Sequence, residues 1–198
     1  MTNMGRYHTK IIHLLLGLAA SSARNIDRDC SSPLGLESGS IPDSSLLASS
    51  SYSLSSVGPS SARLNSEKGG GAWCPKNIIT EKMDKQEFLE IDLKYNHIIT
   101  SVVTQGRFAN GQGQEFAEFF VLQYWREGME GFMSYSNNNG GEILPGNKNT
   151  FTEVETLIEK EIVASKVRVV PFSYHPRTVC MRMELKGCPF DSYGENKS

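Results

Sequence analysis

One loop of the sequence holds an arginine and a glutamate that could build a recognition site. Arg107 and Glu115 lie in a segment that also contains Gly106, Gly111 and Gly113. A guanidinium and a carboxylate on a flexible rim can each bind an opposite charge through charge-assisted hydrogen bonds. The alternative is an ordinary hairpin in which the two side chains only pair with each other, as surface charges commonly do. The residue types permit both interpretations.

The residues before this loop predict the element that positions it. Residues 98–103 read IITSVV, a β-branched apolar run that is typical of a buried strand. Such a strand would fix the start of the loop while the loop residues stay within reach of a partner.

Further strands are predicted along the second half of the chain. Apolar and charged residues alternate in several segments, which is typical of strands with one buried face. Residues 154–161 could form a short helix, but we expect strand and loop there. Many short strands separated by turns indicate an all-β sandwich or jelly roll. The predicted strands are 89–94, 98–103, 121–125, 131–135, 166–169 and 181–186.

Length and composition are those of one soluble globular domain. The chain has 198 residues, of which 38% are hydrophobic and 21% are charged, so one packed core can form. The formal net charge of −2 gives no basic field that would hold nucleic acid. His97 and His175 stand in no nucleophile motif, and the sequence shows no cluster of metal ligands. We therefore predict a protein that is not an enzyme and has no cofactor or metal.

The N-terminal residues predict an export signal. Arg6 and Lys10 precede the short apolar run 11–20, and small residues follow up to Ala23. Ten apolar residues are too few to span a bilayer, so we expect cleavage after residue 23. The alternative, a buried helix, is disfavoured because no helical period continues after Ala23.

Export changes the interpretation of the cysteines. Cys30, Cys74, Cys180 and Cys188 are an even number without a C-x-x-C pair, which predicts two disulfides in an oxidising compartment. Four cysteines allow three connectivities. Because Cys30 begins and Cys188 ends the globular region, a bridge between them would join the ends of the domain and would leave Cys74 to pair with Cys180.

The segment between residues 24 and 75 is polar and rich in serine and glycine. Apolar residues interrupt the serine cluster at 44–61, so we predict ordered loops there rather than a linker. Tyr52 could be either a core ring or an exposed loop contact, and its residue type favours the core. Three glycines shortly before Trp73 predict a sharp turn or a close backbone approach beside a disulfide.

Several motifs in order along the chain resemble the discoidin domain, also called the coagulation factor 5/8 type C domain. The resemblance covers about Cys30 to Cys188 and is strongest toward the N-terminal, collagen-binding domain of discoidin domain receptors. It implies a jelly-roll-like β-barrel of about eight core strands, with terminal strands joined by the Cys30–Cys188 bridge. The motifs are Ile41–Asp43, Ala48–Ser50, Gly71–Pro75, Phe88–Leu93, Thr104–Arg107, Glu115–Phe116 and Cys180–Cys188. The implied organisation is a signal peptide (1–23), a lead (24–29), the discoidin domain (30–188) and a tail (189–198).

The resemblance also implies a ligand site in loops at one end of the barrel. In the receptors, collagen lies in a trench between these loops, lined by aromatic, small polar and charged residues. Arg107 and Glu115 match the receptor residues. The implied ligand-binding set is Tyr52, Ser56, Gly70, Arg107, Glu115 and Thr178, beside the Cys74–Cys180 bridge.

The remaining positions depart from the receptor pattern. Tyr52 replaces Trp, Ser56 replaces Thr, and Thr178 stands where one receptor has Asn. Gly70 replaces an Asp that would pair with Arg107. This guanidinium is then either free for another acceptor or held by the glutamate of its own loop.

The resemblance implies an extracellular ligand-binding or adhesion module, with collagen or a collagen-like matrix protein as its partner. The alternative is a lectin-like glycan-binding or phosphatidylserine-binding adhesion protein, since other discoidin domains use the same loop end for those ligands. Phospholipid binding would need exposed apolar residues beside cations, and the loops offer Leu54, Phe108 and few cations. The chain contains no segment that resembles the receptors' transmembrane helix or kinase. We therefore expect a secreted protein, or the extracellular part of a receptor if the chain is a fragment.

Overall fold

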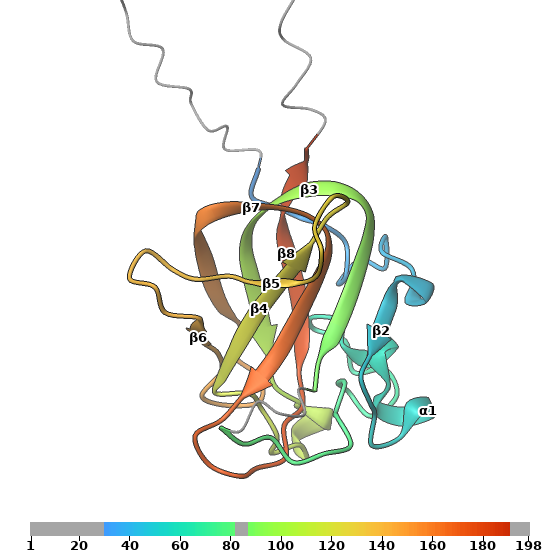
Figure 1. Ribbon diagram of the computed structural model, residues 1–198. Coiled ribbons are helices and arrows are strands. Elements are labelled where there is room, and N and C mark those ends of the chain that lie inside the picture. Colours follow the sequence, from blue (N-terminus) through green and yellow to red (C-terminus); the bar gives the residue numbers. More distant parts are fainter. Residues whose placement is uncertain (1–29, 82–86, 191–198) are drawn as a thin grey trace, which may run out of the picture.

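A computed structural model describes residues 30–81 and 87–190, which form an all-β barrel (Figure 1). Its strands make one eight-stranded, antiparallel, jelly-roll-like sheet, as the sequence predicts. Along the sheet the order is β1 (Ser32–Pro33), β8 (Arg182–Pro189), β3 (Leu89–Gln105), β7 (Val154–Phe172), β4 (Phe119–Trp125) and β5 (Met133–Ser134), while β2 (Leu46–Ala48) pairs with β3 and β6 (Ile143–Pro145) pairs with β4.

The barrel closes because the two longest strands each belong to two layers. The first half of β3 pairs with β2 and the second half of β7, whereas its second half pairs with β8 and the first half of β7. The register shifts between Asp92 and His97, and Lys94 between them has a φ of 67°. This irregularity bends the strand, as bulges do. The segments 89–94 and 98–103, predicted as two strands, are therefore one bent strand.

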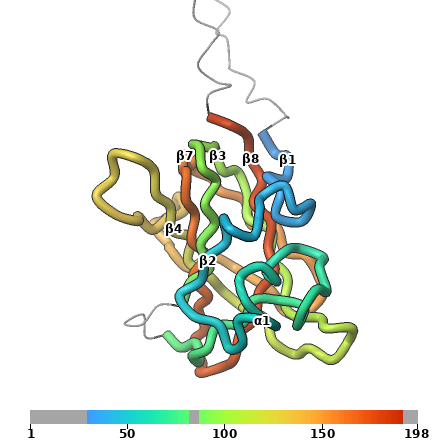
Figure 2. Tube along the Cα trace, turned by 90° about the vertical axis from the view of Figure 1, so that its right-hand side faces the viewer, coloured from blue at the N-terminus to red at the C-terminus, as the bar shows by residue number. Residues whose placement is uncertain are grey.

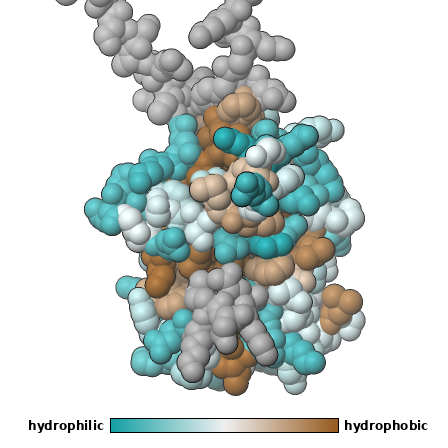
Figure 3. All heavy atoms as spheres, viewed as in Figure 1, coloured by the Kyte–Doolittle hydropathy of each residue, from teal (hydrophilic) through white to brown (hydrophobic). Residues whose placement is uncertain are grey.

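The core lies between the two layers and is filled by apolar side chains from the long strands. Side chains of β3, β4 and β8 are fully buried there, as the alternating pattern predicts. On the face seen in Figure 3, hydrophilic residues cover most of the surface and apolar residues form separate patches. The largest buried side chains include Ile91, Ile99, Leu122, Met183 and Leu185.

The serine-rich segment is ordered and packs along one side of the barrel (Figure 2). It contains the 3₁₀ helices Asp43–Ser45 and Pro59–Ser61, strand β2 and the short helix α1 (Leu54–Val57). A further 3₁₀ turn, Ala109–Gly111, lies in the loop after β3. Residues 154–161, where a helix was the alternative to strand, belong to β7.

Two disulfides lie near the two ends of β8, and both pairings are those expected from the sequence. Cys30 and Cys188 are joined with an S–S distance of 2.06 Å, beside the pairing of β1 with β8. Cys74 and Cys180 are joined at 2.01 Å and connect the glycine-rich segment to the residues just before β8.

The expected signal peptide (1–23), the lead (24–29) and residues 191–198 of the tail lie outside the described residues. Across residues 30–81 and 87–190, no helix has the length and apolar character needed to cross a membrane.

A buried carboxylate fixes the first loop onto β8. Glu184 is 1% exposed, and its Oε1 accepts hydrogen bonds from the backbone N–H groups of Gly35 (3.3 Å), Leu36 (3.1 Å) and Leu185 (2.9 Å). Its Oε2 accepts from the N–H of Glu37 at 2.9 Å. Because buried N–H groups are costly when unpaired, this carboxylate carries much of the loop's order.

We predict that Glu184→Ala lowers the free energy of unfolding by about 3 kcal/mol or more, because it leaves several amides without an acceptor. Urea unfolding followed by tryptophan fluorescence measures the change. Glu127→Gln, at an exposed position, is the matched control and should change the free energy by less than about 0.5 kcal/mol. Equal midpoints for Glu184→Ala and the control would contradict this account of the loop.

Candidate ligand-binding site at the loop end of the barrel

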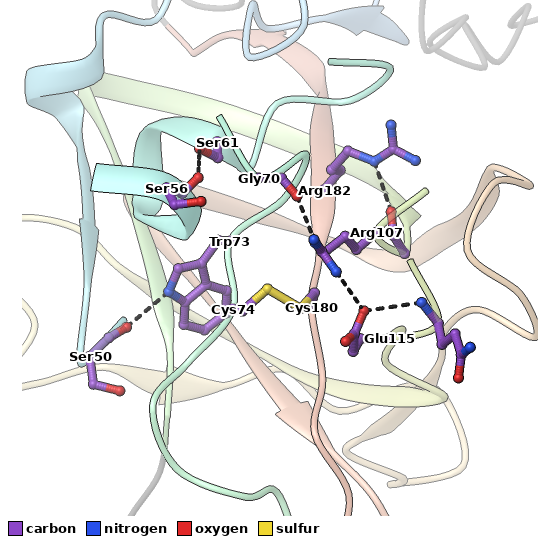
Figure 4. The surroundings of a disulfide bond; sticks show 12 residues. Ser50, Ser56, Ser61, Gly70, Trp73, Cys74, Arg107, Glu115, Cys180 and Arg182 are labelled. Carbon is purple, nitrogen blue, oxygen red and sulfur yellow. Dashed lines mark hydrogen bonds and ion pairs between the residues drawn. A yellow bond between two sulfur atoms is a disulfide. The ribbon is translucent and has the colours of Figure 1, made fainter. Parts of the chain in front are cut away.

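Loops from four parts of the chain meet at the end of the barrel where α1 lies (Figure 1). The loop around α1 is bound to the glycine-rich segment by two backbone hydrogen bonds. The N–H of Tyr52 donates to the carbonyl of Cys74 at 2.9 Å, and the N–H of Cys74 donates to the carbonyl of Val57 at 3.1 Å. The Cys74–Cys180 disulfide joins these loops to the segment before β8. The fourth loop, residues 106–116, is attached through Arg107 (Figure 4).

Arg107 is held by two acceptors rather than being free. Its Nε donates to the backbone carbonyl of Gly70 at 2.6 Å, and its Nη1 donates to Glu115 Oε2 at 3.1 Å. The Arg107 and Glu115 side chains are 27% and 30% exposed. Among the described residues, Arg107 Nη2 has no acceptor, so this half-buried guanidinium keeps a donor for a ligand. The pairing expected of an ordinary hairpin is therefore present, but it also orients the guanidinium toward the glycine-rich loop.

Glu115 is organised to stay ionised. Burial alone would raise the pKa of Glu115, but hydrogen bonds from the backbone N–H groups of Gln114 and Glu115 and from the Arg107 guanidinium outweigh it and hold the pKa below its ordinary value. The carboxylate is therefore charged at neutral pH, and its pairing with Arg107 is complete there.

Tyr52 is exposed, so the expectation that its ring lies in the core is wrong. Its side chain is 78% exposed, next to Leu54 at 76%. The space beneath this loop is filled by Trp73, which is fully buried and donates from Nε1 to the carbonyl of Ser50 at 2.9 Å (Figure 4). Tyr52 is thus the exposed loop contact that was the alternative interpretation.

Gly70 lies where the backbone of two loops approaches closely, as the triple glycine predicts. Its N–H donates to the carbonyl of Ser56 at 2.6 Å, while Gly69 and Gly71 have φ angles of 63° and 81°. A Cβ atom at Gly70 would lie 2.5 Å from Val57 Cγ1 and 2.8 Å from Ser56 Oγ. An aspartate at this position would therefore require Val57 and Ser56 to move.

The six residues implied by the resemblance are not all in direct contact. Hydrogen bonds connect Ser56 to Gly70, Gly70 to Arg107, and Arg107 to Glu115. Tyr52 reaches this group only through the backbone of Cys74, and Thr178 is exposed two residues before Cys180. Tyr52 and Thr178 therefore lie outside the hydrogen-bonded group.

Arg182, which no sequence motif indicated as part of the site, binds the loops through hydrogen bonds and an ion pair. It is 2% exposed; its Nε donates to the carbonyl of Gly106 at 2.8 Å and its Nη2 to that of Thr150 at 3.1 Å. Its Nη1 pairs with Glu67 Oε1 at 2.6 Å, and Glu67 Oε2 accepts from the N–H of Asn110. In the sequence Arg182 lies between two methionines, and this alternation predicts that the Arg182 side chain faces solvent. The side chain is instead buried, because acceptors from distant loops satisfy its charge.

Comparison with known proteins now identifies the family. Residues 46–185 match the family model of the F5/8 type C domain. The chain belongs to this family. It is 44% identical over 164 residues to discoidin domain-containing receptor tyrosine kinase B of Caenorhabditis elegans, a match that covers 83% of this chain and 20% of the receptor. It is 38% identical over 159 residues to human epithelial discoidin domain-containing receptor 1, covering 80% of this chain and 17% of the receptor.

The F5/8 type C chain thus spans about a fifth of the length of these receptors. Among solved structures it is similar to recombinant discoidin II of Dictyostelium discoideum, with a TM-score of 0.58 and 24% identity. That match covers 76% of this chain and 57% of discoidin II, and it supports the same fold.

We predict that the carboxyl group of Glu115 in this F5/8 type C domain titrates with a pKa below the ordinary value of a glutamate. A lowered folded-state pKa means that the stabilisation is present above the unfolded-state pKa and is lost as the pH falls through the folded-state value. Carboxyl ¹³C chemical shifts between pH 2 and 7 measure the Glu115 midpoint, and Arg107→Ala should raise it because the variant removes the Nη1 donor. A Glu115 midpoint at or above the ordinary value of a glutamate, or one unchanged in Arg107→Ala, would contradict the described pairing.

Proposed function

We propose that this F5/8 type C domain is a non-catalytic extracellular module that binds collagen or a collagen-like matrix protein between its end loops. The observation that carries this proposal is Arg107, which is oriented by Gly70 and Glu115 and, among the described residues, keeps a donor without an acceptor. The exposed Tyr52 lies on a loop whose backbone is bound to the same glycine-rich segment. The positions are those that the resemblance to the receptors implies. The two disulfides support an oxidising, extracellular environment.

A triple helix suits this combination of groups. Its side chains project from a rigid rod, so a slot needs an apolar wall and a polar rim that are fixed in advance. The exposed Tyr52 supplies the wall, on loops that the buried Cys74–Cys180 bridge joins, and Arg107 supplies a charged rim. Because the guanidinium already has two protein acceptors, little rotamer entropy is lost when a ligand oxygen becomes the third.

Phospholipid binding is the second candidate, favoured by the exposure of Tyr52 and Leu54 at the loop end. Apolar side chains at this position could enter a membrane interface. Residues 46–62, however, contain no Lys or Arg, so this loop offers no attraction for anionic headgroups. Collagen-like protein binding therefore remains the first proposal, with lectin-like glycan binding as the remaining alternative.

We predict that Arg107→Ala weakens binding to a collagen-mimetic triple-helical peptide by about tenfold or more, because a central Arg is a typical hot spot. Biolayer interferometry against the immobilised peptide measures the affinity, with a non-helical peptide of the same composition as ligand control. Arg126→Ala is the matched protein control, since Arg126 is exposed and follows the end of β4 that lies away from the proposed binding loops. Unchanged binding by Arg107→Ala, together with binding to phosphatidylserine vesicles or galactosides, would favour the alternatives.

We also predict that Tyr52→Trp increases the affinity about two- to tenfold, because the larger ring adds contact area at an exposed site. Gly70→Asp should give no such gain, because its Cβ would collide with Val57 and displace the carbonyl that holds Arg107. The same interferometry assay compares the two variants, with thermal unfolding as the check on folding. A stable Gly70→Asp variant that binds more tightly than Tyr52→Trp would contradict this account.

A further inference from the structure

A second hollow lies beside the trench loops, on residues to which no role has been given above. Its volume is about 440 Å³, within the range of small-ligand and peptide side-chain sites. It lies where the start of β4, the end of β6 and the loop after β7 meet. The residues that line it are Phe116, Glu118, Phe119, Pro145, Gly146, Asn147, Lys148, Tyr174 and His175.

Flat apolar groups form the wall of this hollow. Tyr174 is 52% exposed and is held edge-to-face by Phe119, with ring centroids 5.3 Å apart, and by Phe172 at 5.0 Å. These contacts fix the Tyr174 ring although half of it is open to solvent. Pro145 adds a further flat surface. Such walls suit proline rings, which dock into aromatic-lined grooves.

The charges around the hollow favour an anionic ligand. Glu118, the carboxylate of the lining, is already paired with Arg177 at 2.9 Å, and the Arg177 guanidinium lies over the Phe116 ring at 4.4 Å. Lys148 and His175 are exposed, and neither has a carboxylate partner among the described residues. The rim therefore has unpaired donors that could bind an acidic side chain.

The backbone at the hollow cannot extend the sheet with a ligand strand. Pro145 has no N–H, and its carbonyl already accepts from Thr156 Oγ1 at 2.9 Å. A proline at an edge is a typical block to strand addition. A polyproline II segment does not need such a ladder, because its backbone stays solvated.

We propose that this hollow binds a polyproline II segment that carries an acidic residue, with prolyl rings on Tyr174 and Phe119 and the carboxylate at Lys148 and His175. This inference does not depend on the proposed function, because the trench residues take no part in it. The two sites nevertheless share loops, since Phe116 follows Glu115. A ligand long enough could contact both.

The test uses the ¹⁵N-labelled chain and a capped single-chain peptide with repeated Pro-Pro-Glu, with Pro-Pro-Gln as the neutral control. We expect the acidic peptide to shift the backbone amides of Phe119, Gly146, Lys148 and Tyr174 in a concentration-dependent way. Lys148→Glu should weaken binding at least about fivefold, and so should replacing Glu by Gln in the peptide. The trench variant Arg107→Ala should bind the acidic peptide as the wild type does.

Three outcomes would overturn the inference. The amides at the hollow could fail to shift at millimolar concentrations of the acidic peptide. Lys148→Glu could bind the acidic peptide as tightly as the wild type does, and the wild type could bind the neutral peptide as tightly as the acidic one. A sulfated disaccharide could instead shift these amides when the acidic peptide does not, which would make the hollow a sugar site. Failure of these tests leaves the Arg107 result untouched, so the two proposals are judged separately. The amide spectrum of each variant also reports whether it is folded.

Discussion

The buried guanidinium of Arg182 is the interaction on which the loop end of this barrel depends. It lies at the start of β8 and donates to carbonyls of Gly106 and Thr150 while pairing with Glu67. Burial lowers the pKa of Arg182, and the neighbouring Glu67 opposes that shift, so the charge stays and must be satisfied. Three loops are thereby tied to one rigid strand. The position of Arg107, next to Gly106, follows from this arrangement.

The group that orients Arg107 differs from the one that the resemblance to the receptors implies. A backbone carbonyl at Gly70 accepts the hydrogen bond that the resemblance assigns to an aspartate. The carbonyl fixes the direction of the guanidinium but brings no negative charge, so Glu115 is the one carboxylate that pairs with Arg107 among the described residues. Arg107 therefore keeps more of its positive field for a ligand than it would beside two carboxylates.

Most of the fold could be predicted from the sequence because its signals are local. Alternation in 89–94 and 166–169 identifies strands, and the apolar residues within 44–61 indicate ordered loops. The geometry of the site could not be predicted in the same way, because it depends on contacts between segments that are distant in the sequence. Tyr52 is exposed because Trp73 already fills the space below its loop, and Arg182 is buried because acceptors from three loops reach it. Neither fact can be found from residue type or spacing.

The central claim, that ligand binding occurs at the loop end of the barrel, is tested most directly by a footprint of the complex. Hydrogen–deuterium exchange of the chain with and without a collagen-mimetic triple-helical peptide maps the protected amides. The account predicts protection in residues 50–56, 68–74 and 106–116, with no change in residues 92–97 at the opposite end. Protection confined to residues 92–97, or no protection at saturating peptide, would contradict it.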